Sequence, residues 1–335
     1  MTRPWLLKTL VAGVAAATLM TCSPTLKDGS TRHAVMPDRD IMVIGHRGAA
    51  GLAPENTLAA SAVALELGVD AVELDVHLTR DNVLVVYHDY TLKPETTRTP
   101  DGEWRDMWTG LAIKDLSLAN LKTYDVGRLD PDSFYAGRYP DQVPVDGEAI
   151  PTLSEVIDLM RAKDRPAELW IEIKTSPAEP RVSSRPEDVA DTLVNLLHRE
   201  NFTQDVKILS FDWRALVRVQ QIAPDIPTVF LTNTSSRMDT IQIGRPGPSP
   251  WTAGLDIDSH AGSIPALVAA AGGRFWAPRH NQITPENIAA AHRRGIKIFV
   301  WTPDKEADLQ RCIRRGVDGI ITNRPDRLIV IFESQ

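Results

Sequence analysis

The sequence predicts an α/β fold, a closed (β/α)8 TIM barrel with an inserted segment after the second strand. From residue 41 onward, apolar runs of strand length alternate with amphipathic helical patterns. Repeated alternation of this kind along one chain is typical of the eight-stranded barrel, which we expect to occupy residues 41–330. The alternative is an open doubly wound sheet, but no Gly-x-Gly-x-x-Gly turn follows the first expected strand.

The expected strands are short apolar runs of the kind that becomes buried in a parallel sheet. We place them at 41–45, 70–75, 168–174, 206–210, 227–231, 274–277, 296–301 and 318–322. The helices expected between them are amphipathic, and several begin with proline and an acidic residue in the first turn. They cover 55–67, 152–163, 186–200, 212–222, 262–271, 284–294 and 304–315.

The interval of about 90–150 interrupts this alternation. It is rich in proline, glycine, tyrosine and charged residues, which favours an insertion folded over one mouth of the barrel. A short strand at 83–87 (VLVVY) leads into the insertion and is followed directly by His88.

The first 22 residues do not belong to the predicted barrel. A short basic start precedes an apolar run that is too short for a membrane span, which is the pattern of an export signal. The run ends in LMTC, which resembles a bacterial lipoprotein cleavage site with Cys22 as the acylated residue. An ordinary secretory signal peptide is the alternative. Both predict export to the periplasm or cell envelope, with residues 23–40 as a polar tether.

The composition limits the classes of partner. The net charge is −7 and no long basic run is present, which argues against a general nucleic-acid binder. The only membrane contact that we expect is the lipid anchor at Cys22. The second cysteine, Cys312, has helical surroundings and is expected to pack as an apolar residue, so no disulfide is predicted. The sequence does not indicate an oligomeric state.

Two carboxylates share one face of the second expected strand. Residues two apart in a strand point the same way, so Glu73 and Asp75 in VELDV face the barrel interior while their neighbours face the helices. Two bare carboxylates would repel each other, and a divalent cation would resolve that conflict. Ligation by oxygen alone favours Ca²⁺ or Mg²⁺ over zinc. The alternative is that one of the two acids is paired with a buried base.

The third expected strand repeats this pattern. Glu172 and Lys174 in WIEIK lie on one face, so Glu172 can complete a cage of three carboxylates. Lys174 can bind a phosphate oxygen as a point charge. A local ion pair between these two residues is the alternative.

Two histidines follow strand ends and can exchange protons near neutral pH. Imidazole has an unperturbed pKa of about 6.5, which suits His46 and His88 to act as an acid–base pair. Arg47 offers a planar fork that fits a phosphate diester, or a salt bridge to a nearby acid. Trp301 ends the seventh expected strand and either walls the site or packs in the core.

At this point the motifs resemble a known family, the glycerophosphodiester phosphodiesterases. The likeness spans about 41–330, and its motifs occur in one order along the chain. They are HRGA and PENT within 46–57, VELDVHLTRDNVLVVYHD at 72–89, IPTLSEV at 150–156, EIK at 172–174, VWT at 300–302 and DGIITNRPD at 318–326. Asn323 stands where members of the family often have aspartate.

The resemblance implies a role for each matching residue. It implies a divalent cation, Ca²⁺ or Mg²⁺, held by Glu73, Asp75 and Glu172. It implies that His46 and His88 are the acid–base pair and that Arg47 and Lys174 contact the phosphate. The implied reaction is metal-dependent hydrolysis of a small glycerophosphodiester to glycerol 3-phosphate and an alcohol. The alternatives are a phospholipase D-like enzyme acting on lysophospholipids or sphingolipids, and a non-catalytic surface lipoprotein that binds a ligand.

Overall fold

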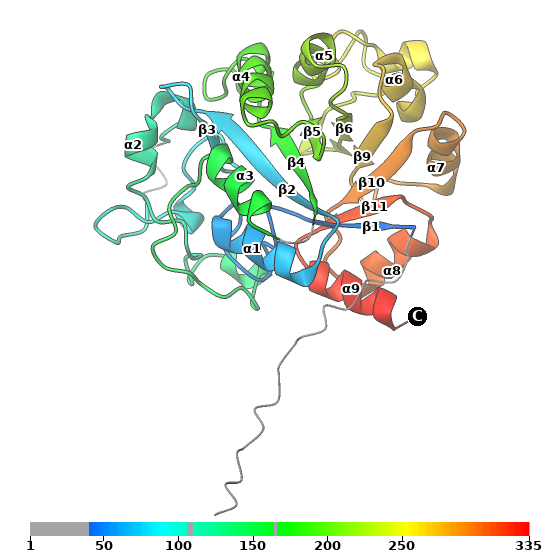
Figure 1. The fold of residues 1–335 in the computed structure, drawn as a ribbon. Helices are drawn as coiled ribbons and strands as arrows, with labels where there is room; N and C mark the ends of the chain where they lie inside the picture. The colour runs from blue at the N-terminus through cyan, green and yellow to red at the C-terminus, as the bar shows by residue number, and fades with distance from the viewer. Residues whose placement is uncertain (1–39, 106–109, 164–165, 335) are drawn as a thin grey trace, which may run out of the picture. The chain divides into compact units, whose positions relative to one another are not determined.

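The computed structural model describes residues 40–105, 110–163 and 166–334 of the 335-residue chain. Eight parallel strands form a ring in the order β1-β11-β10-β9-β6-β5-β4-β2, and the pairing of β1 with β2 closes it (Figure 1). The predicted TIM barrel is therefore confirmed. Its strands are β1 (Met42–Gly45), β2 (Ala71–Leu78), β4 (Glu168–Ile173), β5 (Val206–Ser210), β6 (Thr228–Thr232), β9 (Phe275–Pro278), β10 (Lys297–Trp301) and β11 (Gly319–Thr322).

Helices surround this ring in Figure 1. They are α1 (Leu58–Leu67), α3 (Leu153–Arg161), α4 (Pro186–Arg199), α5 (Trp213–Ile222), α6 (Ile264–Ala270), α7 (Pro285–His292), α8 (Glu306–Arg314) and α9 (Pro325–Glu333). The last of these was not expected from the sequence. No helix in the described part of the chain combines the length and the apolar character needed to cross a membrane.

The start of α1 differs from the expectation. The pattern predicted a helix from residue 55, but the helix begins at Leu58 because Thr57 is extended and its side chain accepts a hydrogen bond from the Ala60 amide. This is the geometry of an N-terminal cap. Glu55 and Asn56 consequently lie in a turn before the helix, where their side chains reach the ends of β1 and β2.

The inward and outward faces of the strands are those that the two-residue period predicts. Val72, Leu74 and Val76 of β2 belong to the core between strands and helices. The barrel interior is a separate, smaller cluster in which Trp170 meets Phe299 edge to face, with ring centroids 4.7 Å apart. Because this cluster fills the barrel interior, the polar inward residues lie beyond it, towards the carboxyl ends of the strands.

The segment after β2 folds back before the insertion begins. The strand β3 (Leu84–Val86) pairs antiparallel with β2, with Val86 opposite Val76, and so returns the chain to the level of Asp75. The insertion that follows contains η1 (Pro94–Thr96), η2 (Ile113–Asp115), α2 (Leu118–Leu121) and η3 (Ala136–Arg138). It has a small core of its own, formed by Val85, Tyr87, Leu92, Ile113, Leu121, Val126 and Ile150.

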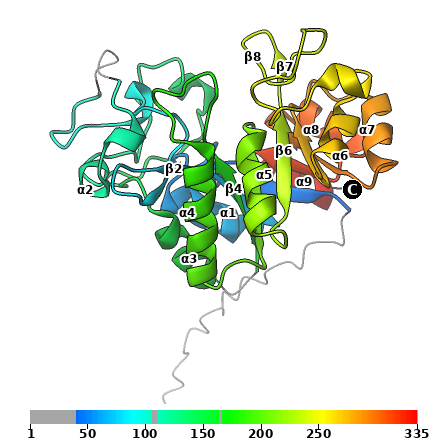
Figure 2. The ribbon, with the colours of Figure 1, turned by 90° about the horizontal axis from the view of Figure 1, so that it is seen from above.

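A second excursion follows β6 and was not expected. It contains the hairpin of β7 (Thr234–Ser235) and β8 (Met238–Asp239) and the short helix η4 (Ile257–His260). Figure 2 shows the hairpin beyond the end of β6 and the insertion beyond β2. Both segments therefore extend from the carboxyl ends of the strands, the end at which barrel enzymes carry their sites.

Candidate active site

Three buried carboxylates converge at the carboxyl ends of β2 and β4. Glu73, Asp75 and Glu172 are each less than a tenth exposed, and one oxygen from each lies within 4.8 Å of the others. The register of the two strands explains this, because Asp75 is paired with Glu172 across the sheet. The structure thus brings together the three acids that the sequence singled out.

The donor set of this cluster fits a hard divalent cation. The Oδ1 atom of Asp75 is buried and has no hydrogen-bond partner, which leaves a carboxylate oxygen available inside the cluster. Burial, followed by repulsion from Asp75 and Glu172, raises the pKa of Glu73 well above its usual value. Such crowding costs free energy unless positive charge compensates it. An all-oxygen set of this kind is the one that Ca²⁺ and Mg²⁺ prefer.

Lys174 supplies part of that compensation. Its Nζ donates to Oε1 of Glu172 at 2.9 Å and lies 3.5 Å from Oδ1 of Asp75. Burial alone would lower the pKa of Lys174, but Glu172 and Asp75 outweigh burial and raise it. The ion pair that the sequence left as an alternative is therefore present, and it lies within the carboxylate cluster.

A tight turn at the end of β1 places His46 and Arg47 against the same cluster. Arg47 has a positive φ of 51°, and its backbone amide donates to Oε2 of Glu73 at 2.9 Å. Gly48 follows with φ of 82°, and a Cβ there would lie 2.5 Å from the backbone of Ala60 in α1. Only glycine fits this close approach, so the turn is held between β2 and α1.

The ring of His46 is oriented by Asn323, which follows the neighbouring strand β11 and is itself held by Asp304. Asp304 accepts hydrogen bonds from both the backbone amide and the side-chain Nδ2 of Asn323. Because an ionised carboxylate only accepts, the Oδ1 atom of Asn323 must face His46, whose Nδ1 lies 2.6 Å away. The neutral ring therefore carries its proton on Nδ1. Its Nε2 atom lies 4.0 Å from Oε2 of Glu73 and is free to accept a proton.

Burial and the neighbouring guanidinium keep His46 uncharged. Burial, with a smaller contribution from Arg47, lowers the pKa of His46 to about 3. The ring is therefore neutral at pH 7, with an open lone pair on Nε2.

The second histidine, His88, follows β3. His88 is part of the cavity lining, and its Nδ1 is 3.4 Å from Oδ1 of Asp89. A third histidine, His77, lies on β2. Its ring is buried, with Nε2 3.2 Å from the carbonyl oxygen of His88, so it contacts the backbone that carries His88.

The guanidinium of Arg47 is held by an acid and by the insertion. Its Nη1 donates to Oε1 of Glu55 at 2.8 Å, and its Nε lies 3.5 Å from Oδ2 of Asp75. The hydroxyl of Tyr135, in the insertion, donates to the other oxygen of Glu55. The sequence left two roles open for Arg47, a phosphate contact and a salt bridge to an acid. The arrangement is compatible with both, because Arg47 is ion-paired and also lines the cavity.

These groups surround one cavity of about 320 Å³ at the carboxyl ends of the strands. The residues that the sequence proposed for the chemistry or for the substrate wall and that line this cavity are His46, Arg47, Glu73, His88, Glu172, Lys174 and Trp301. The ring of Trp301 meets that of Phe211 edge to face, with centroids 5.4 Å apart. In the strand order, β9 and β6 lie between β10 and β5, so this aromatic pair covers the side of the mouth away from β1 and β2.

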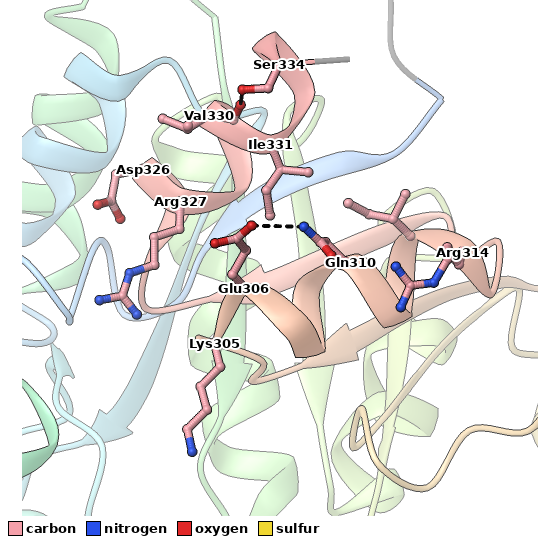
Figure 3. A pocket seen from close by; sticks show the side chains of 10 residues that line it. Lys305, Glu306, Gln310, Arg314, Asp326, Arg327, Val330, Ile331 and Ser334 are labelled. Carbon is pink, nitrogen blue, oxygen red and sulfur yellow. Dashed lines mark hydrogen bonds between the residues drawn. The ribbon is translucent and has the colours of Figure 1, made fainter.

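A second hollow, of about 710 Å³, lies between α8 and α9 (Figure 3). Gln310, one of the polar side chains that line it, donates to Glu306 within α8. It contains none of the residues discussed above. Its size does not make it the functional site, because the groups able to bind cations and move protons lie in the smaller cavity.

The fold and the smaller cavity define a class of protein, a TIM-barrel enzyme with acid–base and cation-binding groups at the carboxyl ends of its strands. Residues 46–327 match the model of the glycerophosphoryl diester phosphodiesterase family. The chain belongs to that family, and the resemblance predicted from its motifs is confirmed.

Individual relatives agree over most of their length. A glycerophosphodiester phosphodiesterase of Caldanaerobacter subterraneus subsp. tengcongensis is 33% identical over 86% of this chain and 96% of its own. A crystal structure from Silicibacter pomeroyi that carries the same family name covers 88% of this chain and 93% of its own, with 33% identity and a TM-score of 0.78. A phosphodiesterase of Oleispira antarctica, solved with sn-glycerol-3-phosphate, shares the fold at 24% identity and a TM-score of 0.62, covering 88% of this chain and 97% of its own.

Proposed function

We propose that this enzyme hydrolyses glycerophosphodiesters to glycerol 3-phosphate and an alcohol by metal-assisted acid–base catalysis. The observation that supports this most directly is the meeting of two histidines and a carboxylate cluster in one cavity. Family membership supports the same class of reaction. The product bound by the Oleispira antarctica phosphodiesterase is the one that this reaction would release.

In this proposal Glu73, Asp75 and Glu172 hold the cation. A bound Ca²⁺ or Mg²⁺ would supply positive charge that stabilises the negative phosphate oxygens in the transition state. Arg47 and Lys174 would add to that stabilisation from the cavity wall, each while retaining its carboxylate partner.

The two histidines would divide the proton transfers. His46 is assigned as the base because its Nδ1 proton is held by Asn323, which leaves the lone pair of Nε2 open to the cavity. It would take a proton from the nucleophile, which is either water or the 2-hydroxyl of the substrate's own glycerol. The second route would form a cyclic phosphate, which water then opens to glycerol 3-phosphate. His88, oriented by Asp89, would protonate the oxygen of the leaving alcohol.

Alanine substitution tests this assignment. General acid–base catalysis is typically worth about 10²–10⁴ in rate. His46→Ala and His88→Ala should each lower kcat by at least 10²-fold in assays with Ca²⁺ or Mg²⁺, with an unchanged circular dichroism spectrum. His198→Ala, an exposed histidine on α4, is the matched control and should retain activity. Turnover near that of the wild type in either test variant would refute the pairing.

A phospholipase D-like activity is a second candidate because Phe211 and Trp301 give the mouth an apolar wall. Lysophosphatidylcholine and glycerophosphocholine share a head group and differ by one acyl chain. A higher kcat/KM for the first would favour the lipid substrate.

We also propose that the protein is exported as a lipoprotein acylated at Cys22, with residues 41–330 forming the catalytic barrel. Residues 1–39 lie outside the described part of the chain. Cys22→Ala should release the protein from the membrane fraction of a bacterial host, and an unchanged distribution would refute the anchor.

A further inference from the structure

The cationic side chains that line the active-site cavity fall into two groups. Arg47 and Lys174 form ion pairs with Glu55 and Glu172. Lys93 and Arg138, which also line the cavity, have no carboxylate within ion-pair distance among the described residues. Their described contacts are with aromatic rings.

Both cations lie against one ring of the insertion. The Nζ atom of Lys93 is 3.2 Å from the centroid of the Tyr135 ring, and the guanidinium carbon of Arg138 is 5.6 Å from the same centroid. Arg138 is also 5.8 Å from the ring of Tyr139, which packs edge to face on Tyr135. Cation–π contacts hold a side chain in place but leave its charge uncompensated by any anion.

The backbone and rings of this wall are fixed to the barrel. The amide of Lys93 donates to the hydroxyl of buried Tyr87 at 2.7 Å, one residue before His88. The hydroxyl of Tyr135 donates to Glu55, which in turn holds Arg47. The two cations are therefore attached at points that also position the proposed reacting groups.

The acids of the cavity are already engaged. Asp304 accepts from Thr322 and Asn323, and Asp89 faces His88. Glu73 and Glu172 belong to the carboxylate cluster. The mouth on the insertion side thus presents two positive charges that, among the described residues, have no carboxylate within ion-pair distance.

We propose that Lys93 and Arg138, on the wall formed by Tyr135 and Tyr139, are a subsite for a negatively charged head group. The enzyme would then prefer diesters whose leaving alcohol carries an anion, such as a further phosphate, over diesters of choline. This inference rests on the proposed function and names its substrate class. The main alternative is a preference for choline diesters, since the rings of Phe211 and Trp301 offer aromatic surface to a quaternary ammonium.

Three substrates with one glycerophosphate group in common test the subsite. Glycerophosphocholine has a cationic head, glycerophosphoglycerol a neutral one, and bis(glycerophospho)glycerol an anionic one. We expect kcat/KM to rise in that order. The value for bis(glycerophospho)glycerol is first divided by two, because that compound has two equivalent diesters, and it should then exceed the value for glycerophosphocholine by roughly tenfold. Raising NaCl from about 0.05 to about 0.5 M should reduce the preference, because salt screens exposed charges.

Lys93→Met and Arg138→Met should each lower the preference for the anionic over the cationic substrate by roughly threefold or more, mainly through KM. Arg293→Met is the matched control, since it removes one exposed positive charge at the end of α7 and should leave the preference unchanged. A preference for glycerophosphocholine, or an unchanged preference in both test variants, would overturn the subsite.

Titration calorimetry of bis(glycerophospho)glycerol with the wild type and with Lys93→Met separates the subsite from the reaction. Weaker binding by the variant supports the subsite even if none of the three diesters is hydrolysed, a result that would refute the proposed function alone. Equal binding by the two proteins refutes the subsite whatever the turnover.

Discussion

The amide of Asn323 determines which nitrogen of His46 carries the proton. Asn323 lies 277 residues from His46 in sequence, and Asp304 fixes which end of its amide faces the ring. The sequence placed Asn323 where the family often has aspartate. An amide oxygen accepts from the Nδ1 proton as a carboxylate would, but it brings no negative charge that would raise the pKa of His46.

Replacing Asn323 should therefore slow the reaction through His46. Asn323→Leu removes the acceptor, and we expect kcat to fall by about 10- to 100-fold with little change in KM, as for other residues that orient a reacting imidazole through a hydrogen bond. Steady-state kinetics on glycerophosphoglycerol would measure this. Asn323→Asp keeps an acceptor and should lose less. An unchanged kcat for Asn323→Leu would show that His46 does not need this partner.

At the scale of elements, one side chain of the insertion reaches the turn that holds Arg47. Tyr135 hydrogen-bonds Glu55 in the turn before α1, and Glu55 pairs with Arg47 after β1. Burial, followed by the charge of Glu55, raises the pKa of Tyr135, so its hydroxyl remains a donor across the working range of pH. This contact couples the position of the insertion to that of Arg47.

Tyr135→Phe should loosen the insertion without unfolding the barrel. The lost hydrogen bond to a carboxylate is typically worth about 1.5–3 kcal/mol locally. Hydrogen exchange measured by mass spectrometry should speed up in residues 128–145 and stay unchanged in α4 and α5. Tyr124→Phe is the control within the insertion, because no hydrogen bond of its hydroxyl is described. Equal exchange in the wild type and Tyr135→Phe would exclude the coupling.

At the scale of the whole molecule, the carboxylate cluster lowers the stability of the protein without its cation. Three buried acids share one volume, and Lys174 compensates only part of their charge. A ligand that binds only the folded state raises the free energy of unfolding by RT ln(1 + [L]/Kd), or about 2.7 kcal/mol at a hundredfold excess over Kd.

Metal should accordingly raise the melting temperature. For a barrel of this size we expect a rise of roughly 4 °C between EDTA and a hundredfold excess of Ca²⁺ or Mg²⁺ over Kd, measured by differential scanning fluorimetry. Glu73→Gln removes one repulsive charge, so its melting temperature in EDTA should exceed that of the wild type, and its response to metal should largely disappear. Glu66→Gln, an exposed acid on α1, should behave as the wild type. A wild type insensitive to both metals would remove the cation from the proposal.

Much of the fold could be predicted because its signals are local. The alternation of apolar strands and amphipathic helices placed all eight barrel strands, and the first-turn residues placed most helices. The prediction failed where a single contact overrides the pattern, as when the cap at Thr57 shortened α1. It also missed α9, and it missed the β7–β8 hairpin because strands of two residues are too short to show a two-residue period.

The sequence by itself determined which side chains face inward, since the two-residue period of a strand is a property of the backbone. That is why Glu73, Asp75 and Glu172 could be selected before any contact was known. Only the tertiary structure decided the partners that tune them. Asn323 meets His46 because β11 pairs with β1, and Tyr135 meets Glu55 because the insertion folds back over the mouth. Contacts of this kind depend on the packing of the closed barrel, which no short stretch of sequence encodes.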